Sequence, residues 1–402
     1  MRIIIHVDVN NAFLSWMAVE MLKNGCKFDI RKRYAVIGGD ENVRRGIVLA
    51  KSDPCKRRGV VTAESLYMAR RKCPYLEVYK GDYRIYKKYS DLMYNYLLQY
   101  SDIIERYSID ECFVDYTNSI RLFGNPVKLA YKIKDDIKNK YGFTVNVGVG
   151  NNKLLAKMAS DLEKPDKVHT LFDYEVKNKM WVLPIEDLFM VGKSASRKLK
   201  EMGINTIGNL ANSDKNVLIK HFKKHGILMW EYANGIDNSK VEFKRDNPKS
   251  VSSSTVLPYN YSDKKEIYKI IKKLSCDTGM RLRNNKLYAN TVSIWVKYSN
   301  FVKVSKQIKL DSCISTDNDI YKYACLLFDK LWNDDNYIRG LCVGVDNLGN
   351  NRDKQLSLFE KKSIINNIIE EDSDNKLQMA MDSIRNKYGS NIIGYADEIN
   401  NN

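Results

Sequence analysis

Two acidic residues stand side by side in a segment that otherwise alternates like a β-strand. The segment spans residues 107–115, with Asp110 and Glu111 in its middle. Neighbouring strand residues point to opposite faces of a sheet, and two carboxylates this close repel each other. A divalent cation bound at this point would offset that repulsion. The segment therefore predicts an acidic, metal-dependent centre built on a β-sheet.

A second acidic strand supplies the matching half of this centre. Residues 3–7 form an apolar run that ends in Asp8 and Val9. If the two strands are neighbours, Asp8 meets Asp110 and Glu111, and the backbone carbonyl of Val9 adds a further oxygen. Oxygen ligands suit Mg²⁺, and a pair of such ions can activate a hydroxyl and stabilise a leaving pyrophosphate. The alternative is an ordinary acidic strand edge.

The charge balance indicates a polyanionic partner. The 402 residues include 66 Lys and Arg against 49 Asp and Glu, a formal net charge of +17. Nucleic acid is the first choice of partner and an anionic membrane the second. Residues 240–310 carry 16 Lys and Arg against 5 Asp and Glu, whereas residues 360–402 have a net charge of −3. We therefore expect the main nucleic-acid surface after the middle of the chain.

Several functional classes are disfavoured by the sequence. No apolar run reaches the roughly 18 residues that span a bilayer, and the N-terminus lacks a signal-peptide pattern. The eight cysteines form no C-x-x-C pair, which indicates reduced thiols and argues against a zinc site. We expect a cytoplasmic protein with no membrane partner.

The pattern of elements predicts a multidomain α/β (α+β) chain. Up to about residue 165, expected strands are 3–9, 34–37, 47–50, 103–107, 111–115 and 144–150, and expected helices are 12–23, 64–72, 83–100, 126–140 and 152–162. Residues 166–236 are typical of short helices with glycine breaks, and 237–249 of a polar linker. From 250 to 346 the expected order is β-α-β-β-α-β, and 347–402 form a flexible tail.

Two features are typical of DNA binding without base recognition. Gly192 and Lys193 lie in a glycine turn before an expected helix, where free N–H groups can bind a phosphate. The alternative is a plain turn between helices. Basic residues on expected strands would follow a phosphate backbone, although such residues can also form a solubilising face; they are Lys297, Lys303, Lys306 and Lys309.

Three further motifs are less specific. Residues 355–359 place apolar anchors after a polar linker, which favours insertion into a partner's groove over packing on their own domain. Residues 38–41 resemble the signature turn of diguanylate cyclases but lack its following aromatic, so a simple strand-end turn is favoured. Residues 375–388 predict an amphipathic helix, for which core packing and partner binding are both open; its apolar face carries Leu377, Met381 and Ile384.

Together the motifs resemble the Y family of DNA polymerases, the translesion class, from residue 1 to about 359. Residues 8–10 look like its first catalytic motif, 107–111 like its second and 152–165 like its conserved helix. Residues 190–194 and 232–237 are similar to its thumb, and 355–359 to the pentapeptide that binds the sliding clamp. Two positions, Asn10 and Lys56, look closer to the polymerase V catalytic subunit and the Gram-positive UV-repair branch than to polymerase IV.

The resemblance implies the polymerase fold that is compared to a right hand. Its expected parts are palm (1–10 and 76–165), fingers (11–75), helical thumb (166–236), linker (237–249), little finger (250–346) and a tail with the clamp motif (347–402). It implies template-directed, low-fidelity DNA synthesis past lesions, with two Mg²⁺ ions and no proofreading. The implied partners are primer-template DNA, a deoxynucleoside triphosphate and the sliding clamp, and the chain is expected to act as a monomer.

The resemblance also assigns roles to single residues. Asp8, Asp110 and Glu111 would be catalytic and, with the carbonyl of Val9, hold the metal. Phe13 would be the steric gate against ribonucleotides. Lys164 would contact the triphosphate, with Asp161 in the same motif, and the clamp would contact Gln355, Leu356, Leu358 and Phe359.

The fingers depart from the family pattern. Many members carry Thr, Tyr and Arg where this chain has Ala50, Asp53 and Lys56. Lys56 keeps a charge but loses the bidentate fork of arginine, and Lys51 could substitute. This leaves one alternative, a catalytically weak or inactive relative that binds DNA and the clamp. A cyclic-dinucleotide synthase is a second alternative.

Overall fold

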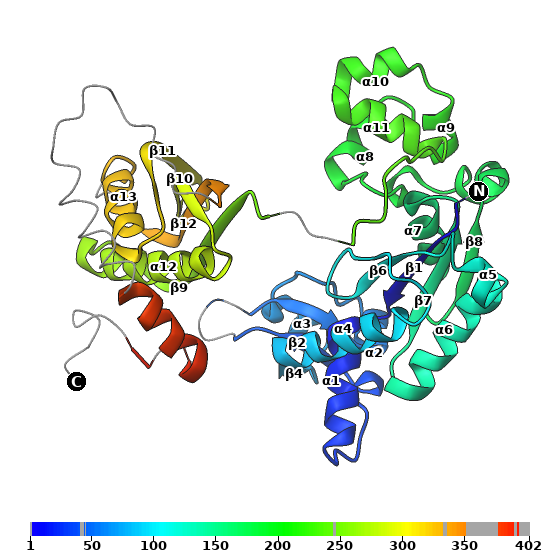
Figure 1. The fold of residues 1–402 in the computed structure, drawn as a ribbon, viewed down its shortest axis with the longest axis horizontal. Coiled ribbons are helices and arrows are strands. Elements are labelled where there is room, and N and C mark those ends of the chain that lie inside the picture. The colour runs from blue at the N-terminus through cyan, green and yellow to red at the C-terminus, as the bar shows by residue number, and fades with distance from the viewer. Residues whose placement is uncertain are drawn as a thin grey trace. The chain divides into compact units, whose positions relative to one another are not determined.

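The computed structural model describes residues 2–40, 44, 46–243, 247–332, 336–350, 377–389 and 392–393. Their contacts divide the chain into two compact units (Figure 1). The first comprises Met1–Gly39 and Gly46–Arg245, and the second Asp40–Arg45 and Asp246–Asn402. Among the described residues, no helix combines the length and apolar composition needed to cross a membrane.

A five-stranded sheet organises the first unit. Its strand order is β5-β6-β1-β7-β8, antiparallel except for the pair β7 and β8. The strands are β1 (Ile4–Val9), β5 (Ile104–Arg106), β6 (Glu111–Asp115), β7 (Val145–Gly150) and β8 (Val168–Leu171). The expected adjacency of the two acid-bearing strands is confirmed. Strand β8 was not expected, and with it the sheet continues past residue 165.

The two faces of this sheet are covered differently. Ile5 and Val7 of β1 pack into the main core, to which α1 (Ala12–Lys23), α4 (Tyr83–Leu97) and α6 (Pro126–Tyr141) contribute. Alternation sends Ile4, His6 and Asp8 to the opposite face, where α7 (Lys153–Asp161) lies. A Cβ atom at Gly148 of β7 would lie 2.0 Å from the carbonyl oxygen of Ala156. The glycine therefore allows α7 to approach the acidic face closely.

The acidic segment is a hairpin turn followed by a strand. The expected strand at residues 111–115 is confirmed, because β6 spans Glu111–Asp115, and Asp110 lies in the turn before it. The backbone N–H groups of Tyr107 and Ser108 both donate to the carbonyl of Glu111 (3.0 and 3.3 Å). The Ser108 hydroxyl donates to Asp110 Oδ1 at 2.6 Å. Local side-chain bonding thus stabilises a turn at this position, and Asp110 projects from the turn.

A smaller sheet lies in the region expected to form the fingers. It has the strand order β3-β2-β4 and consists of β2 (Ala35–Gly38), β3 (Val48–Lys51) and β4 (Glu77–Lys80). Helix α3 (Leu66–Lys72) was expected, whereas the short α2 (Asp53–Arg57) was not. The Ser52 side chain caps α2 by accepting from Cys55 N–H. Glu41 of the cyclase-like turn lies outside the described residues.

The expected thumb consists of short helices around a small core. They include α8 (Lys193–Glu201), α9 (Ile207–Ala211), α10 (Lys215–Phe222) and α11 (Lys224–Ala233). Leu199, Ile207, Leu218 and Met229 are fully buried among them.

The second unit has the predicted β-α-β-β-α-β order. Its elements are β9 (Ser250–Tyr261), α12 (Lys264–Asn284), β10 (Tyr288–Tyr298), β11 (Lys303–Ile314), α13 (Asp317–Asp329) and β12 (Ile338–Gly349). The strands form one antiparallel sheet in the order β11-β10-β12-β9. Both helices pack their apolar residues against the same core.

A further helix spans residues 377–388, but its buried face is not the apolar one that the sequence indicated. Leu377 and Ile384 are exposed, and of the expected face only Met381 is buried. The other buried side chains are Gln378, Asp382 and Arg385. Arg283 of α12 donates to Asp382 at 2.6 Å and pairs with Asp317 at 2.9 Å, and Arg385 also pairs with Asp317, at 3.4 Å. Mutual pairing of these charges permits their burial.

Candidate active site

The register of β1 and β6 brings two of the acids together. Asp8 lies directly opposite Glu111 in the antiparallel pair, so both side chains project from the face covered by α7. The backbone N–H of Val9 donates to the carbonyl of Asp110 at 3.1 Å, which places Asp110 at the same end of the sheet. The four residues assigned to the metal centre therefore meet at one strand end.

Two lysines neutralise two of these acids. Lys164 Nζ donates to Asp8 Oδ2 and lies 2.7 Å from Asp161 Oδ1. Lys157 Nζ of α7 donates to Glu111 Oε1 at 2.9 Å. Within the described ranges, no group of three His, Cys, Asp or Glu side chains has metal-binding geometry. Asp8 and Glu111 are instead each paired with an ammonium group.

A buried histidine lies behind the acids. His6 is two residues before Asp8 on the same face; its Nδ1 is 2.8 Å from Ser160 Oγ and its Nε2 is 3.8 Å from Glu111 Oε2. Burial lowers the pKa of His6, although the nearby carboxylates act in the opposite direction. The sequence analysis missed His6, Lys157 and Ser160. The alternation of β1 could have indicated His6.

The pKa values of the two paired carboxylates shift in opposite directions, although burial alone would raise both. For Asp8, loss of hydration raises the pKa, although the charge of Lys164 opposes it. For Glu111, burial acts in the same direction, but His6 and Lys157 outweigh it and lower the pKa to about 2. Glu111 is therefore ionised throughout the neutral range.

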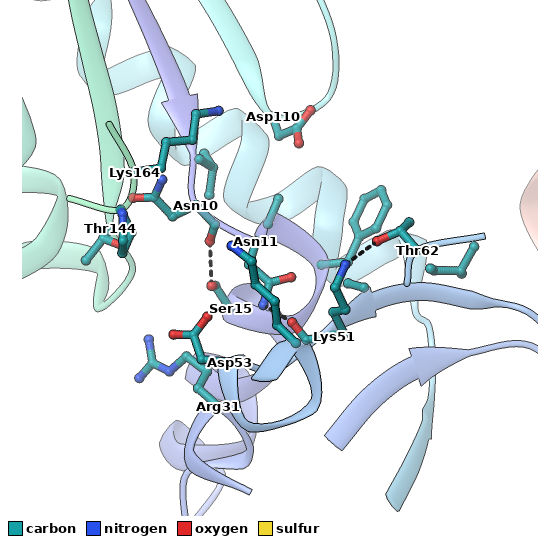
Figure 2. A pocket seen from close by; sticks show the side chains of 17 residues that line it. Asn10, Asn11, Ser15, Arg31, Lys51, Asp53, Thr62, Asp110, Thr144 and Lys164 are labelled. Carbon is teal, nitrogen blue, oxygen red and sulfur yellow. Dashed lines mark hydrogen bonds between the residues drawn. The ribbon is translucent and has the colours of Figure 1, made fainter. Parts of the chain in front are cut away.

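A cavity of about 460 Å³ opens beside the acids (Figure 2). Asp110 and Lys164 line it from the acidic centre, and Lys51 from the fingers region. Its other lining residues include Val9, Asn10, Asn11, Phe13, Arg31, Ala50, Asp53, Lys56 and Thr62. The cavity thus combines several cationic groups with an aromatic wall.

The aromatic wall is held rigidly. The ring centroid of Phe13 lies 4.5 Å from that of Tyr86 and 6.4 Å from that of Trp16. Asn11, just before α1, adopts a left-handed conformation (φ 50°) and donates from Nδ2 to the carbonyl of Lys51 at 2.6 Å. This bond ties the start of α1 to β3, so Phe13 and Lys51 keep a fixed relation.

Two lysines of the fingers region face the cavity. Lys51 Nζ donates to Thr62 Oγ1 at 3.0 Å, and Lys56 lies on α2. Burial and the charge of Lys56 lower the pKa of Lys51. Asp53, whose carboxylate would repel a triphosphate unless it points away, also lines the cavity. The two lysines repel each other, so an anion between them would be stabilised.

An amide pair fixes the segment that carries Lys164. Asn10 Nδ2 donates to Asn146 Oδ1 at 3.0 Å, and Asn10 Oδ1 accepts from Asp166 N–H at 2.9 Å. Asn146 Nδ2 in turn donates to two carbonyl oxygens, those of Ser160 (2.9 Å) and Glu163 (2.6 Å). Asn146 is fully buried. The pair therefore holds both ends of the segment.

The glycine turn before α8 borders a second cavity, of about 880 Å³. Gly192 is the N-cap residue of α8, and no side chain caps the helix there. Lys193, Arg197 and Lys200 also line this cavity, and Lys193 is exposed. The surface presents backbone N–H groups beside Lys193 and Arg197, whereas Lys200 pairs with Glu186 at 2.8 Å and Glu201 also lines the cavity.

The lysines of the second unit divide between the two faces of its sheet. Lys297 and Lys303 lie opposite each other on the open face, where the Lys303 ammonium is 4.2 Å from the Trp295 ring centroid. Lys306 lies opposite the core residue Ile294. Its side chain therefore leaves the edge strand β11 on the face that the helices cover. Gln355, Leu356, Leu358 and Phe359 lie outside the described residues.

Three family models match the chain in sequence order. Residues 7–161 match the impB/mucB/samB family, residues 186–237 the thumb domain of DNA polymerase iota, and residues 248–358 the C-terminal domain of the impB/mucB/samB family. These matches cover the acidic centre, the glycine turn and the β-α-β-β-α-β unit.

Curated relatives match over almost the whole chain. DNA polymerase IV of Clostridium acetobutylicum is 48% identical over 392 residues, which are 98% of this chain and 97% of that protein. DNA polymerase IV 1 of Bacillus subtilis is 32% identical over 98% of this chain and 92% of that protein. Among solved structures, a Y-family polymerase chimera of Dbh and Dpo4 has a TM-score of 0.75 and 26% identity, covering 87% of this chain and all of that chain. An insertion ternary complex of Dbh DNA polymerase has a TM-score of 0.58 and 26% identity, with the same coverage of both chains.

Proposed function

Because this chain belongs to the Y family of DNA polymerases and is of the bacterial polymerase IV type, we propose that Asp8, Asp110 and Glu111 form its catalytic centre. The chain is a DNA-directed DNA polymerase of the translesion class. The observation that carries the assignment is the register that sets Asp8 opposite Glu111, next to Asp110, which lines a cavity together with three lysines. The relatives reported above are named DNA polymerase IV and do not support the expected closer kinship to the polymerase V branch, and the cytoplasmic location stays a prediction.

Polymerases of this family depend on metal ions, and the donor set here fits Mg²⁺. The candidate ligands are the carboxylates of Asp8, Asp110 and Glu111 and the carbonyl of Val9, all of them oxygen donors. A pair of ions bound there would activate the primer 3′-hydroxyl and stabilise the leaving pyrophosphate. The protein's part is to hold three carboxylates at one strand end.

The cavity is the proposed site of the incoming deoxynucleoside triphosphate. Lys51, Lys56 and Lys164 would bind its phosphates as point charges, and Asp161 would hold Lys164 in reach. Phe13 would lie against the sugar and exclude a 2′-hydroxyl. As expected for a translesion polymerase, synthesis would be of low fidelity and without proofreading.

Primer extension with purified chain tests the function directly. We expect extension with Mg²⁺ and deoxynucleotides, none with EDTA, and synthesis across an abasic template position. The presence of Asp53 in the cavity is the one observation that favours a catalytically weak relative. Tight primer-template binding without extension would support that second candidate.

The fingers lysines give a first quantitative prediction. Lys51→Met and Lys56→Met should each raise the KM for deoxynucleotides about 10-fold, with a smaller change in kcat, because each removes a charge that binds substrate and transition state alike. Steady-state single-nucleotide insertion measures both constants. The control is Lys80→Met, because Lys80 is the one exposed residue of β4 and lies outside the cavity lining. An unchanged KM in both fingers variants would contradict their assignment.

Two surfaces are proposed for the DNA backbone. One is the turn at Gly192 and Lys193, where N–H groups and charge coincide. The other is the open face of the second unit's sheet, with Lys297 and Lys303 in front and Lys306 at the edge strand. Both surfaces would contact the phosphate backbone and not the bases, which suits a polymerase that must bind DNA of any sequence.

The sliding clamp is the proposed processivity partner of a monomeric polymerase. Alanine at Gln355, Leu358 and Phe359 should abolish stimulation by the clamp, because the motif supplies local concentration rather than chemistry. Extension rates with and without clamp measure this effect. Equal loss of both rates would show that the segment acts in the polymerase itself.

A further inference from the structure

Lys164 is bound by two carboxylates at once. Its ammonium donates to Asp8 and lies 2.7 Å from Asp161 Oδ1. The Asp8 side chain is 8% exposed, whereas that of Lys164 is 39% exposed and reaches into the cavity (Figure 2). The lysine therefore covers a carboxylate that has little other access to solvent.

The second ammonium of the centre is placed differently. Lys157 is 10% exposed, belongs to the body of α7 and lies 5.6 Å from the Phe189 ring centroid. It bonds Glu111 and is absent from the residues that line the cavity. Of the two lysines on the catalytic acids, only Lys164 has a path toward a ligand in the cavity.

We propose that Lys164 is an exchangeable counter-ion that moves from Asp8 to the incoming triphosphate and thereby frees Asp8 for a divalent cation. The inference rests on the proposed function, in which Asp8 is a metal ligand and the cavity takes the triphosphate. Asp161 keeps its bond to the ammonium during the exchange, so the lysine pivots instead of leaving. The amide pair of Asn10 and Asn146 holds the backbone on which it pivots.

The exchange makes nucleotide and metal bind cooperatively. Each phosphate that attracts Lys164 removes a competitor for Asp8, and each cation on Asp8 releases Lys164 for a phosphate. By linkage the two effects are equal in size. If Lys164 served only to bind phosphate, it would not compete with a cation for Asp8 when no nucleotide is bound.

Binding of Mn²⁺ without nucleotide, followed by the paramagnetic resonance signal of the free ion, tests the competition. Lys164→Met should bind Mn²⁺ about 5-fold or more tightly than the wild type. Lys51→Met is the matched control, since it removes the same charge from the same cavity but from a lysine bonded to Thr62. The double variant with Asp8→Asn should lose the gain. If Lys164→Met does not fold by circular dichroism, Lys164→Gln replaces it.

A second measurement tests the same exchange from the other side. With EDTA present, Asp8→Asn should tighten binding of deoxyadenosine triphosphate, because Lys164 no longer has to leave a carboxylate. In the Lys164→Met background the gain should be about 5-fold smaller. Equal gains in both backgrounds would overturn the inference.

The outcomes separate this inference from the function on which it rests. If Asp8→Asn weakens Mn²⁺ binding while Lys164→Met and Lys51→Met behave alike, the metal centre stands and the exchange is refuted. If Asp8→Asn changes Mn²⁺ binding in no background, the proposed centre itself fails, and the exchange fails with it.

Discussion

Replacing Asp110 by asparagine should lower primer extension about 1,000-fold or more and leave the fold intact. Asp110 is the one acid of the centre without an ammonium partner among the described interactions; its Oδ1 accepts from Ser108 at 2.6 Å. An amide oxygen can keep that bond. The change therefore removes one negative charge from the proposed metal site at nearly constant shape.

Single-turnover incorporation at saturating nucleotide measures this loss, and primer-template affinity measured beside it should change little. Asp115→Asn is the matched control, because Asp115 lies at the far end of β6 from Asp110 and its carboxylate accepts from Thr117 N–H. Its rate should stay within about twofold of the wild type. Full activity in Asp110→Asn would remove the residue from the catalytic centre.

Replacing Phe13 by alanine should reduce discrimination against ribonucleotides about 100-fold. The ring is braced by Tyr86 at 4.5 Å and lines the cavity, so it cannot move aside for a 2′-hydroxyl. Alanine leaves space at this wall. The ratio of kcat/KM for a deoxynucleotide to that for its ribonucleotide gives the discrimination.

The neighbouring aromatic Tyr83 provides the control for this variant. Its ring lies 6.2 Å from that of Phe13 but is not part of the cavity lining. Tyr83→Ala should loosen the same aromatic group while keeping the discrimination within a few-fold of the wild type. Equal relaxation in both variants would mean that general loosening, and not the gate, admits the ribose.

The pairing of β1 with β6 was predictable from the sequence, because each segment has a strand-like apolar pattern and each carries an acidic residue at one end. The apolar run before Asp8 is β1 and the segment after Asp110 is β6, and each strand is the other's neighbour in the sheet. The β-α-β-β-α-β order was predictable for the same reason, since strand and helix periods differ clearly. These elements depend on local pattern more than on distant contacts.

The missed features depend on contacts between distant segments. Lys157 reaches Glu111 only because Gly148 lets α7 approach the sheet, and neither residue alone signals this. The buried face of helix 377–388 is polar because Asp382 and Arg385 find partners on Arg283 and Asp317. A sequence pattern assigns charges to the surface, so it selected a neighbouring face that shares only Met381 with the buried one.

The amide pair of Asn10 and Asn146 constrains how this site can change over evolutionary time. Both Asn146 N–H groups are committed to backbone carbonyls, so its oxygen always faces position 10. An aspartate at position 10 alone would set oxygen against oxygen in a buried place, at a cost of about 1–3 kcal/mol. Position 146 must change first or together with it. The two positions are thus expected to be epistatic in this chain.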